Sequence, residues 1–291
     1  MSATTYDGRG TSLPRMMLNK VPEVTFFFWV IKIMCTTVGE SAADYLNDNL
    51  GFGLTNTTYV AGALLAVLLV WQFRLRRYVP GVYWSAVVVI SVFGTLITDN
   101  LTDGHNVPLT TTTPVFAVIL AIVFAIWYGF ERTLSIHTII TTRREAFYWL
   151  AILFTFALGT AAGDLVAEKA DLGYGVSILI FGGAIAVIAV LHYGLKVNAI
   201  LTFWLAYILT RPLGASIGDF LSQKSHKYGG LGLGTTGTSY LFLGCILALV
   251  AYLTITKRDQ TPPELIEHDE QVAATHRHGH ARPLSPLSDE A

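Results

Sequence analysis

The chain has few charged residues and few cysteines. Only 13% of its 291 residues are Asp, Glu, Lys or Arg, whereas 53% are hydrophobic. This composition is typical of a membrane protein with several spanning helices. Both cysteines, Cys35 and Cys245, fall in hydrophobic stretches, where a thiol usually packs as a small apolar group, so we expect neither a disulfide nor a metal pair. The net charge of −1 gives no indication of nucleic-acid binding.

Motifs of enzyme active sites are also missing. The sequence shows no Ser, His and Asp arrangement, no nucleotide-binding glycine loop, no Walker motif and no His-Glu helical motif of metallohydrolases. We therefore expect neither an enzyme nor an ATP-driven pump, and no cofactor. Zinc and copper are disfavoured as cargo, because His105 and His226 fall in predicted outer loops and His192 stands alone at a helix end.

Long hydrophobic runs dominate what is present. A helix needs about 20 residues to cross roughly 30 Å of hydrocarbon, and eight stretches meet this length: 25–46, 56–73, 82–101, 112–130, 147–168, 175–194, 198–221 and 236–256. The sequence thus predicts an all-α, polytopic membrane protein. The polar segment 1–24 lacks the short apolar core and small-residue cleavage site of a secretory signal, so we expect the first span to be retained.

The loop charges predict the orientation. If the spans alternate, Lys169, Lys224 and Lys227 fall on one side of the membrane. The other side receives twelve basic residues: Arg9, Arg15, Lys20, Arg74, Arg76, Arg77, Arg132, Arg143, Arg144, Lys196, Lys257 and Arg258. Because short cytoplasmic loops carry the excess of Lys and Arg, we expect both termini in the cytoplasm.

One spacing occurs four times and is the most informative feature of the chain. An aromatic residue and a Trp are followed after nine residues by a Gly and, five positions later, by an Asp. The four acids are Asp44, Asp99, Asp164 and Asp219, at intervals of 55, 65 and 55 residues. This register predicts a two-helix unit present in four copies that share one orientation, with any pseudo-symmetry axis along the membrane normal.

Polar residues recur at steps of four around each Asp and therefore share a helix face. The column contains Lys32, Thr36, Glu40, Asp44 and Asp48 in the first repeat; Ser91, Thr95, Asp99 and Asp103 in the second; Thr160, Asp164 and Glu168 in the third; Arg211, Ala215, Asp219 and Gln223 in the fourth. Charged groups inside a membrane are costly and usually face a cavity or the protein interior. We expect the outermost acids, Asp48, Asp103 and Glu168, to lie at helix ends near the surface.

These columns predict a shared cation site. The candidate ligands are Glu40, Asp44, Asp99, Asp164 and Asp219, with the hydroxyls of Thr36, Thr95 and Thr160, and the candidate charge partners are Lys32 and Arg211. Glu40 and Asp44 are expected as the core pair, while the other acids complete the site or relay protons. Five acids against two bases leave negative charge for a cation or protons to offset. The alternative is that each Asp caps a helix end or bonds a neighbouring helix.

The repeated glycines and the remaining segments complete the plan. Gly39, Gly94, Gly159 and Gly214 are expected to let helices approach closely. The chain divides into a cytoplasmic segment 1–24, a membrane half 25–131, a cytoplasmic loop 132–145, a second membrane half 146–256 and a tail 257–291. The tail has too little apolar surface to fold, and whether its run from His276 to His280 binds metal is open.

Several motifs carry a resemblance: Lys20-Val21-Pro22-Glu23-Val24-Thr25, Thr37-Val38-Gly39-Glu40 followed by Asp44, Thr133-Leu134-Ser135-Ile136-His137, and the last two Gly-to-Asp segments. Over about residues 18–256 the chain resembles the bacterial multi-pass membrane proteins built from a tandem repeat of unknown function, number 347 in its series. The resemblance implies an integral protein of the bacterial inner membrane, made of repeated helix pairs. It implies no activity.

The sequence favours a secondary transporter or exporter of a cation, with a divalent metal such as manganese as the leading cargo, because carboxylates and hydroxyls suit hard ions. Its predicted partners are the lipid bilayer and the transported cation, without nucleic acid. A proton-coupled carrier of a small organic ion, bound by Arg211 or Lys32, is one alternative. A non-transporting membrane scaffold or sensor is another. The sequence leaves open homo-oligomer formation, and whether the repeats surround one pathway or form two halves around a site.

Overall fold

The computed structural model describes residues 19–49, 51, 53–224 and 229–259. This part of the chain is all helical and contains eight helices long and apolar enough to cross a membrane, which confirms the predicted fold class of a multi-pass membrane protein. The helices are α1 (Phe26–Asp44), α2 (Leu54–Arg74), α3 (Pro80–Asp99), α4 (Leu109–Glu131), α5 (Thr142–Asp164), α6 (Tyr174–Tyr193), α7 (Ala199–Ser222) and α8 (Gly234–Thr256). The expectations for residues 1–18, for His226 and for the His run of the tail lie outside the described residues.

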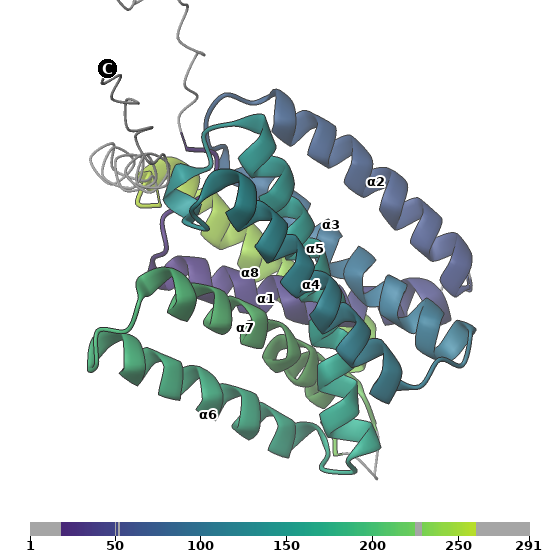
Figure 1. The fold of residues 1–291 in the computed structure, drawn as a ribbon. Helices are drawn as coiled ribbons and strands as arrows, with labels where there is room; N and C mark the ends of the chain where they lie inside the picture. The colour runs from purple at the N-terminus through teal and green to yellow at the C-terminus, as the bar shows by residue number, and fades with distance from the viewer. Residues whose placement is uncertain (1–18, 50, 52, 225–228, 260–291) are drawn as a thin grey trace, which may run out of the picture.

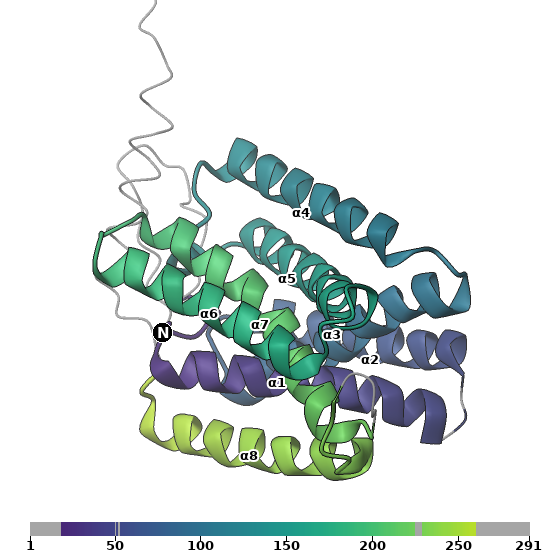
Figure 2. The same ribbon diagram turned by 90° about the horizontal axis from the view of Figure 1, so that it is seen from below.

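The odd-numbered helices form a closed ring at the centre of the molecule. Helices α1 and α5 each pack against both α3 and α7, while the even-numbered helices lie outside this ring (Figures 1 and 2). The inner helices bury more than half of their most apolar stretch, whereas the outer helices bury about a fifth of theirs. The exposed apolar side chains of the outer helices therefore form the surface that faces lipid.

Each outer helix packs along the odd helix that follows it in the chain. Helix α2 lies against α3, α4 against α5 and α6 against α7, and α8 closes the circle by packing against α1. The repeat in the sequence, for example α1 with α2, therefore differs from the pair that packs together in space. As a consequence, the two predicted membrane halves, 25–131 and 146–256, exchange outer helices, because α4 packs on α5 and α8 packs on α1.

The four repeated glycines make this ring tight, as the sequence predicts. Gly39 faces Ser91, Gly94 faces Phe156, Gly159 faces Arg211 and Gly214 faces Thr36, so each glycine contacts the next odd helix around the ring. A Cβ atom at any of the four would overlap the residue it faces. Because these four partners are themselves equivalent positions in the repeats, the same close contact is made four times.

The inner helices change geometry at the repeated Asp. Asp44, Asp99 and Asp164 are the last residues of α1, α3 and α5, and each is followed by one π-helical turn, at Tyr45–Asn49, Asn100–Gly104 and Leu165–Lys169. Such turns are rare and concentrate at functional sites. Helix α7 has no such turn and continues to Ser222, but it contains Pro212, which removes one backbone hydrogen bond inside the helix.

At the opposite end, where α1 begins and α8 ends, side-chain pairs fix the connecting segments. Lys20 pairs with Glu145 at 2.6 Å, with both side chains 1% exposed. His137 lies 3.3 Å from Glu23, so the segments 20–25 and 133–137, which carry much of the family resemblance, meet each other. We call this the terminal end of the molecule, and the end with the four Asp residues the acidic end.

Candidate cation site

A polar cavity of about 260 Å³ lies at the acidic end of the ring. It is lined by Glu40, Ala43, Asp44, Asn47, Leu54, Asp99, Thr102, Asp103, Leu109, Asp164, Tyr174, Asp219 and Gln223. All five acids that the sequence predicts as ligands therefore meet around one space, and Asp103 is a sixth. Among the described residues, neither Lys nor Arg lines this cavity.

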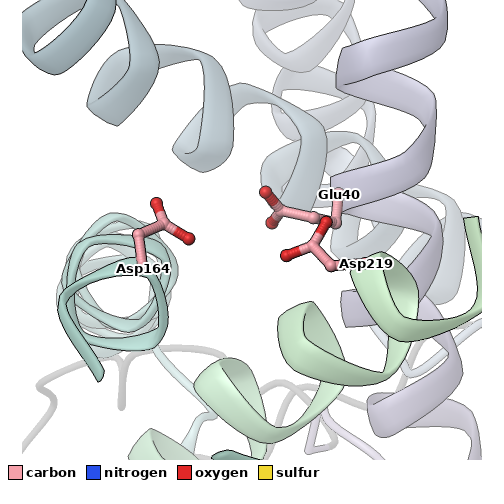
Figure 3. Close-up of side chains that lie close together, drawn as sticks. All are labelled: Glu40, Asp164 and Asp219. Carbon is pink, nitrogen blue, oxygen red and sulfur yellow. The ribbon is translucent and has the colours of Figure 1, made fainter. Parts of the chain in front are cut away.

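Three of these carboxylates come especially close together. One oxygen from each of Glu40, Asp164 and Asp219 lies within 4.8 Å of the other two, and Figure 3 shows Asp164 facing the other two side chains across the gap. The residues come from α1, α5 and α7, so the group exists only when the ring is assembled. Two bonds of 2.3–2.6 Å, as calcium makes to oxygen, span a separation of this size.

The three carboxylates that lie closest together are not those of the expected core pair, Glu40 and Asp44. Residues four apart on one helix are separated by about 6 Å along its axis, whereas α7 places Asp219 beside α1 at the level of Glu40. Gly218 makes this approach close, because its backbone lies against Thr37 and Glu40. Asp44 instead accepts a hydrogen bond of 3.2 Å from the side-chain amide of Gln223.

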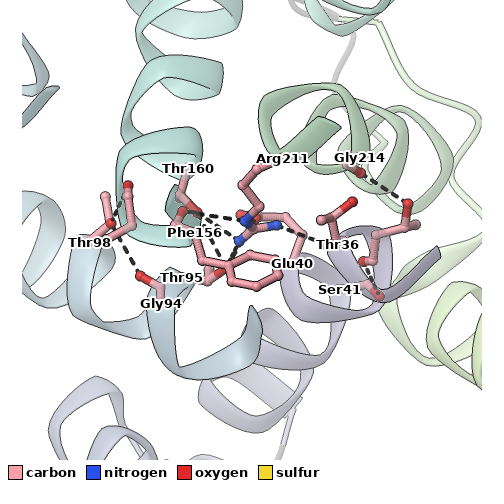
Figure 4. A network of polar contacts seen from close by, with 12 residues as sticks. Thr36, Glu40, Ser41, Gly94, Thr95, Thr98, Phe156, Thr160, Arg211 and Gly214 are labelled. Carbon is pink, nitrogen blue, oxygen red and sulfur yellow. Dashed lines mark hydrogen bonds and ion pairs between the residues drawn. The ribbon is translucent and has the colours of Figure 1, made fainter. Parts of the chain in front are cut away.

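The inner wall of the site is formed around Arg211, whose side chain is fully buried. Its Nη2 donates to Glu40 Oε2 at 3.1 Å, to Thr160 Oγ1 at 2.7 Å and also to Thr95 Oγ1. Its Nη1 donates to the carbonyl of Thr36 at 2.8 Å, and Figure 4 shows the guanidinium at the centre of this network. One side chain of α7 thus links all three other inner helices and neutralises Glu40.

The predicted hydroxyl ligands serve this network rather than the cavity. Thr95 and Thr160 accept from Arg211, and their hydroxyl oxygens are 3.4 Å apart. The hydroxyl of Thr36 donates to the carbonyl of Ile33 at 2.6 Å. None of the three threonines lines the cavity. Thr95 and Thr160 through their hydroxyls, and Thr36 through its backbone carbonyl, position Arg211 and, through it, Glu40.

Lys32 lies deeper in the ring and does not pair with an acid as the sequence suggested. Its Nζ lies 4.2 Å from the centre of the Phe156 ring and 4.4 Å from that of Tyr207. Within the described part of the chain this buried nitrogen has no hydrogen-bond partner. The aromatic faces offset part of the cost of burying the amine, as in other cation–π contacts.

The four repeats match a family model at residues 27–78, 82–133, 147–198 and 202–259. The family is described as a Repeat of Unknown Function, DUF347. The chain belongs to this family. Comparison with curated proteins and with solved structures gave no match.

Some residues of the site in this DUF347 chain escaped the sequence argument. Asp103 and Gln223 stand in the repeated polar columns but were not predicted as ligands. Asp103 is exposed, as expected near a helix end, yet both residues line the cavity. Asn47 and Tyr174 lie outside the columns, because a π-helical turn carries Asn47 and the start of an outer helix carries Tyr174. The side chains of Asp48 and Glu168 lie outside the described part.

Proposed function

We propose that this DUF347 protein is a secondary transporter of a cation, most simply a divalent metal such as manganese, in the bacterial inner membrane with both termini in the cytoplasm. The observation that carries the proposal is the meeting of Glu40, Asp164 and Asp219 from three inner helices at one cavity, with one oxygen of each within 4.8 Å of the others. Carboxylates placed inside a membrane bundle usually mark an ion pathway.

The charge balance of the cavity supports a positively charged cargo. Six carboxyl groups line it, whereas Arg211 lies behind Glu40 and is already bonded to four groups besides that carboxylate. Grouped carboxylates in a low-dielectric site repel one another unless a cation or protons offset their charge. Cation entry coupled to proton release follows naturally from such a site.

The donor atoms favour a hard ion. Besides the carboxylates, the cavity offers the hydroxyl of Thr102 and the side-chain amides of Asn47 and Gln223. Oxygen donors of this kind suit magnesium, calcium and manganese, whereas copper and zinc prefer thiolate or imidazole. No Cys or His lines the cavity among the described residues, which agrees with the preference for manganese over zinc.

The closed inner half of the ring supports a transporter rather than an open channel. Beyond Arg211 and Lys32, the ring is filled by aromatic residues, and the hydroxyls of Tyr83 and Tyr148 lie 2.5 Å apart across it. Trp84 is also fully buried at this level. An ion in the cavity can reach the terminal end only if the inner helices rearrange, as alternating access requires.

The two alternatives make different demands on the site. A carrier of an organic anion needs a basic residue facing the cavity, but neither Arg211 nor Lys32 is among the lining residues. A non-transporting scaffold needs acids neutralised within the fold and no cavity, whereas six acids surround an open space here. We therefore favour the cation carrier.

Thermal stability of the purified protein with a panel of divalent cations tests the site. We expect one or a few oxygen-preferring metals to raise the melting temperature of the wild type, and Asp164→Asn and Asp219→Asn to abolish this rise. Asp171→Asn is the matched control, because Asp171 is an exposed acid at the acidic end that does not line the cavity, and Asn tolerates its positive φ of 56°.

Flux measurements then separate binding from transport. Wild-type protein in liposomes with an internal metal-sensitive dye should move the stabilising cation, and Asp164→Asn should not. A metal panel without any stabilisation, or with equal stabilisation in the Asp164→Asn variant, would refute the cation site. Binding without flux in liposomes would instead favour the sensor.

A further inference from the structure

A second cavity, larger than the acidic one, lies elsewhere in the molecule. A groove of about 490 Å³ lies at the terminal end between α1, α6 and α7, with the segment 134–137 along its side. Its lining is mainly apolar, with Trp29, Ile33, Ile185, Ile188 and Phe203 among the residues. Cavities of 300–1,000 Å³ are the usual size of ligand sites. The cation proposal does not use this groove.

Comparison of the repeats shows why the groove exists. The family matches place Ala189 of α6 at the position of Leu69 in α2 and Phe124 in α4. The fourth match is six residues longer, which places Val250 of α8 at the same position. Three repeats thus carry a large apolar side chain here, and only the third carries Ala.

A second position follows the same pattern. His192 of α6 stands where the other repeats have Gln72, Trp127 and Leu253. Those three residues are each 1% exposed, whereas His192 is half-buried and lines the groove. Trp127 therefore fills a space that His192 leaves open.

The aromatic neighbours confirm the equivalence. In the second repeat, Phe124 and Trp127 pack on Trp204, with ring centres 4.9 and 5.8 Å apart. The corresponding Trp of the first repeat is Trp29, and it lines the groove opposite α6. The groove is therefore the space that two aromatic side chains fill elsewhere in the same fold.

We propose that this groove binds one acyl chain of an anionic phospholipid. The groove lies beside outer helix α6, whose exposed face is apolar, as expected for contact with the bilayer. Its polar atoms belong to a small set that includes His137, His192 and Thr202. Thr202 bonds His192 Nδ1 at 3.0 Å and holds that ring at the groove.

The charge of the terminal end favours an anionic headgroup. The loop after α6 carries exposed Lys196, and the described residues of the terminal end include ten of the 19 Arg and Lys residues of the chain. Basic pockets between membrane helices on this kind of surface bind anionic headgroups. A lipid with one acyl chain in the groove and its phosphate toward Lys196 matches both the apolar wall and the basic residue in the loop after α6.

The test introduces into α6 the two aromatic side chains that the second repeat carries at the equivalent positions of α4. The double variant Ala189→Phe/His192→Trp should fill the groove with residues that the fold already accommodates in α4. Native mass spectrometry of wild-type protein should show one retained phosphatidylglycerol, and delipidated protein should gain thermal stability from phosphatidylglycerol but not from phosphatidylcholine with the same acyl chains. The double variant should lose the bound lipid and this gain.

The matched control is Leu179→Phe, which adds an aromatic ring on the same helix at a side chain that is 75% exposed. It should behave like the wild type. Retention of the lipid by the double variant, equal stabilisation by both lipids, or the absence of any bound lipid would overturn the proposal. None of these results depends on whether the acidic cavity binds a cation.

Discussion

Single residues at equivalent positions of the repeats have become different parts of one network. Eight positions before the repeated Asp stand Thr36, Ser91, Phe156 and Arg211. The contact with the preceding glycine is common to all four, but only the fourth repeat places a charge there. That charge lies at the centre of the ring and pairs with Glu40. Glu40 is the only acid at its repeat position, because the equivalent residues are Thr95, Thr160 and Ala215.

Replacing Arg211 should therefore destabilise the whole ring. Arg211→Met removes links to three helices and leaves Glu40 buried without its base, at a cost of about 3–5 kcal/mol. Arg211→Lys should recover only part of the loss, because an ammonium cannot reproduce the several directed bonds of a guanidinium. Melting of the purified variants measures both effects.

The companion variant Glu40→Gln separates pairing from packing. If the ion pair matters, Arg211→Met/Glu40→Gln should be more stable than the sum of the two single losses predicts, since the second change removes the unpaired charge. Additive losses would show that Arg211 acts through its bonds to Thr36, Thr95 and Thr160 alone.

At this scale the sequence predicted the acids better than their partners. The four Asp residues and Glu40 were recognisable because an acid inside a hydrophobic helix is costly and usually has a function. The pairing of Arg211 with Glu40 could not be read from spacing, because 171 residues separate them and their meeting depends on the order of helices around the ring. The same holds for Lys32, whose aromatic neighbours come from α5 and α7.

Helix contacts depend on the glycine positions, which gives a prediction at the scale of elements. Gly214→Ala should cost about 1–3 kcal/mol through overpacking, because the added Cβ would overlap Thr36 in α1. Gly183→Ala in α6 is the control, since nothing lies within 4 Å of a Cβ at that position. That variant should be as stable as the wild type or slightly more so, as Ala favours helix. Equal melting temperatures for the two variants would contradict tight packing of the ring.

The end of α8 is held by a contact that should respond to pH. Asp259 Oδ2 accepts a hydrogen bond of 2.5 Å from Tyr78, and its carbonyl accepts from the Glu23 backbone at 2.7 Å. Burial raises the pKa of Asp259 above its ordinary value, although the bond from Tyr78 opposes this. The stability contributed by the neutral carboxyl is therefore present at low pH and is lost as the pH rises through the raised pKa.

The variant Asp259→Asn isolates this effect, because it keeps a neutral side chain of similar shape. We expect the melting temperature of the wild type to fall relative to that of Asp259→Asn as the pH rises from the ordinary Asp range, near 4, toward neutrality. A difference between the two proteins that does not change with pH would contradict the proposed titration. Other groups that titrate are common to both proteins and cancel in the comparison.

Elements were predicted well where hydropathy determines them. The eight expected spans correspond to the eight helices, since a run of about 20 apolar residues has few other structures available in a membrane. The π-helical turns after Asp44, Asp99 and Asp164 were not predicted, because no residue type marks such a turn. These turns contribute Asn47, Thr102 and Asp103 to the cavity, so this part of the site depends on backbone geometry that the sequence pattern does not reveal.

For the whole molecule, the period of the repeats predicted the number of units but not how they join. The interval in the middle is 65 residues long, whereas the other two are 55. In the structure that interval contains the segment from Arg132 to Thr141, which lies across the terminal end. This segment contacts Lys20, Glu23 and Trp204, and α5, the helix after it, also contacts Lys20. The extra length therefore covers one end of a single ring.

Because α4 packs on α5 and α8 packs on α1, each half of the chain needs an outer helix or a partner from the other half. This gives a prediction for a chain that is expressed as two fragments. In fragment 1–133, α4 lacks its partner α5 and α1 lacks α8, while fragment 134–291 lacks the α4 that covers α5 and the α1 that α8 packs against. Neither fragment can close the ring or bring Glu40 to Arg211. Expressed alone, each should be degraded or aggregate; expressed together, they should copurify through a tag on either one and melt as one unit. A stable, monodisperse fragment 1–133 would contradict the ring, because two independent halves would each keep their own outer helices.

If Arg211→Met abolishes the copurification of the two fragments, the central network around Arg211 is what joins the fragments.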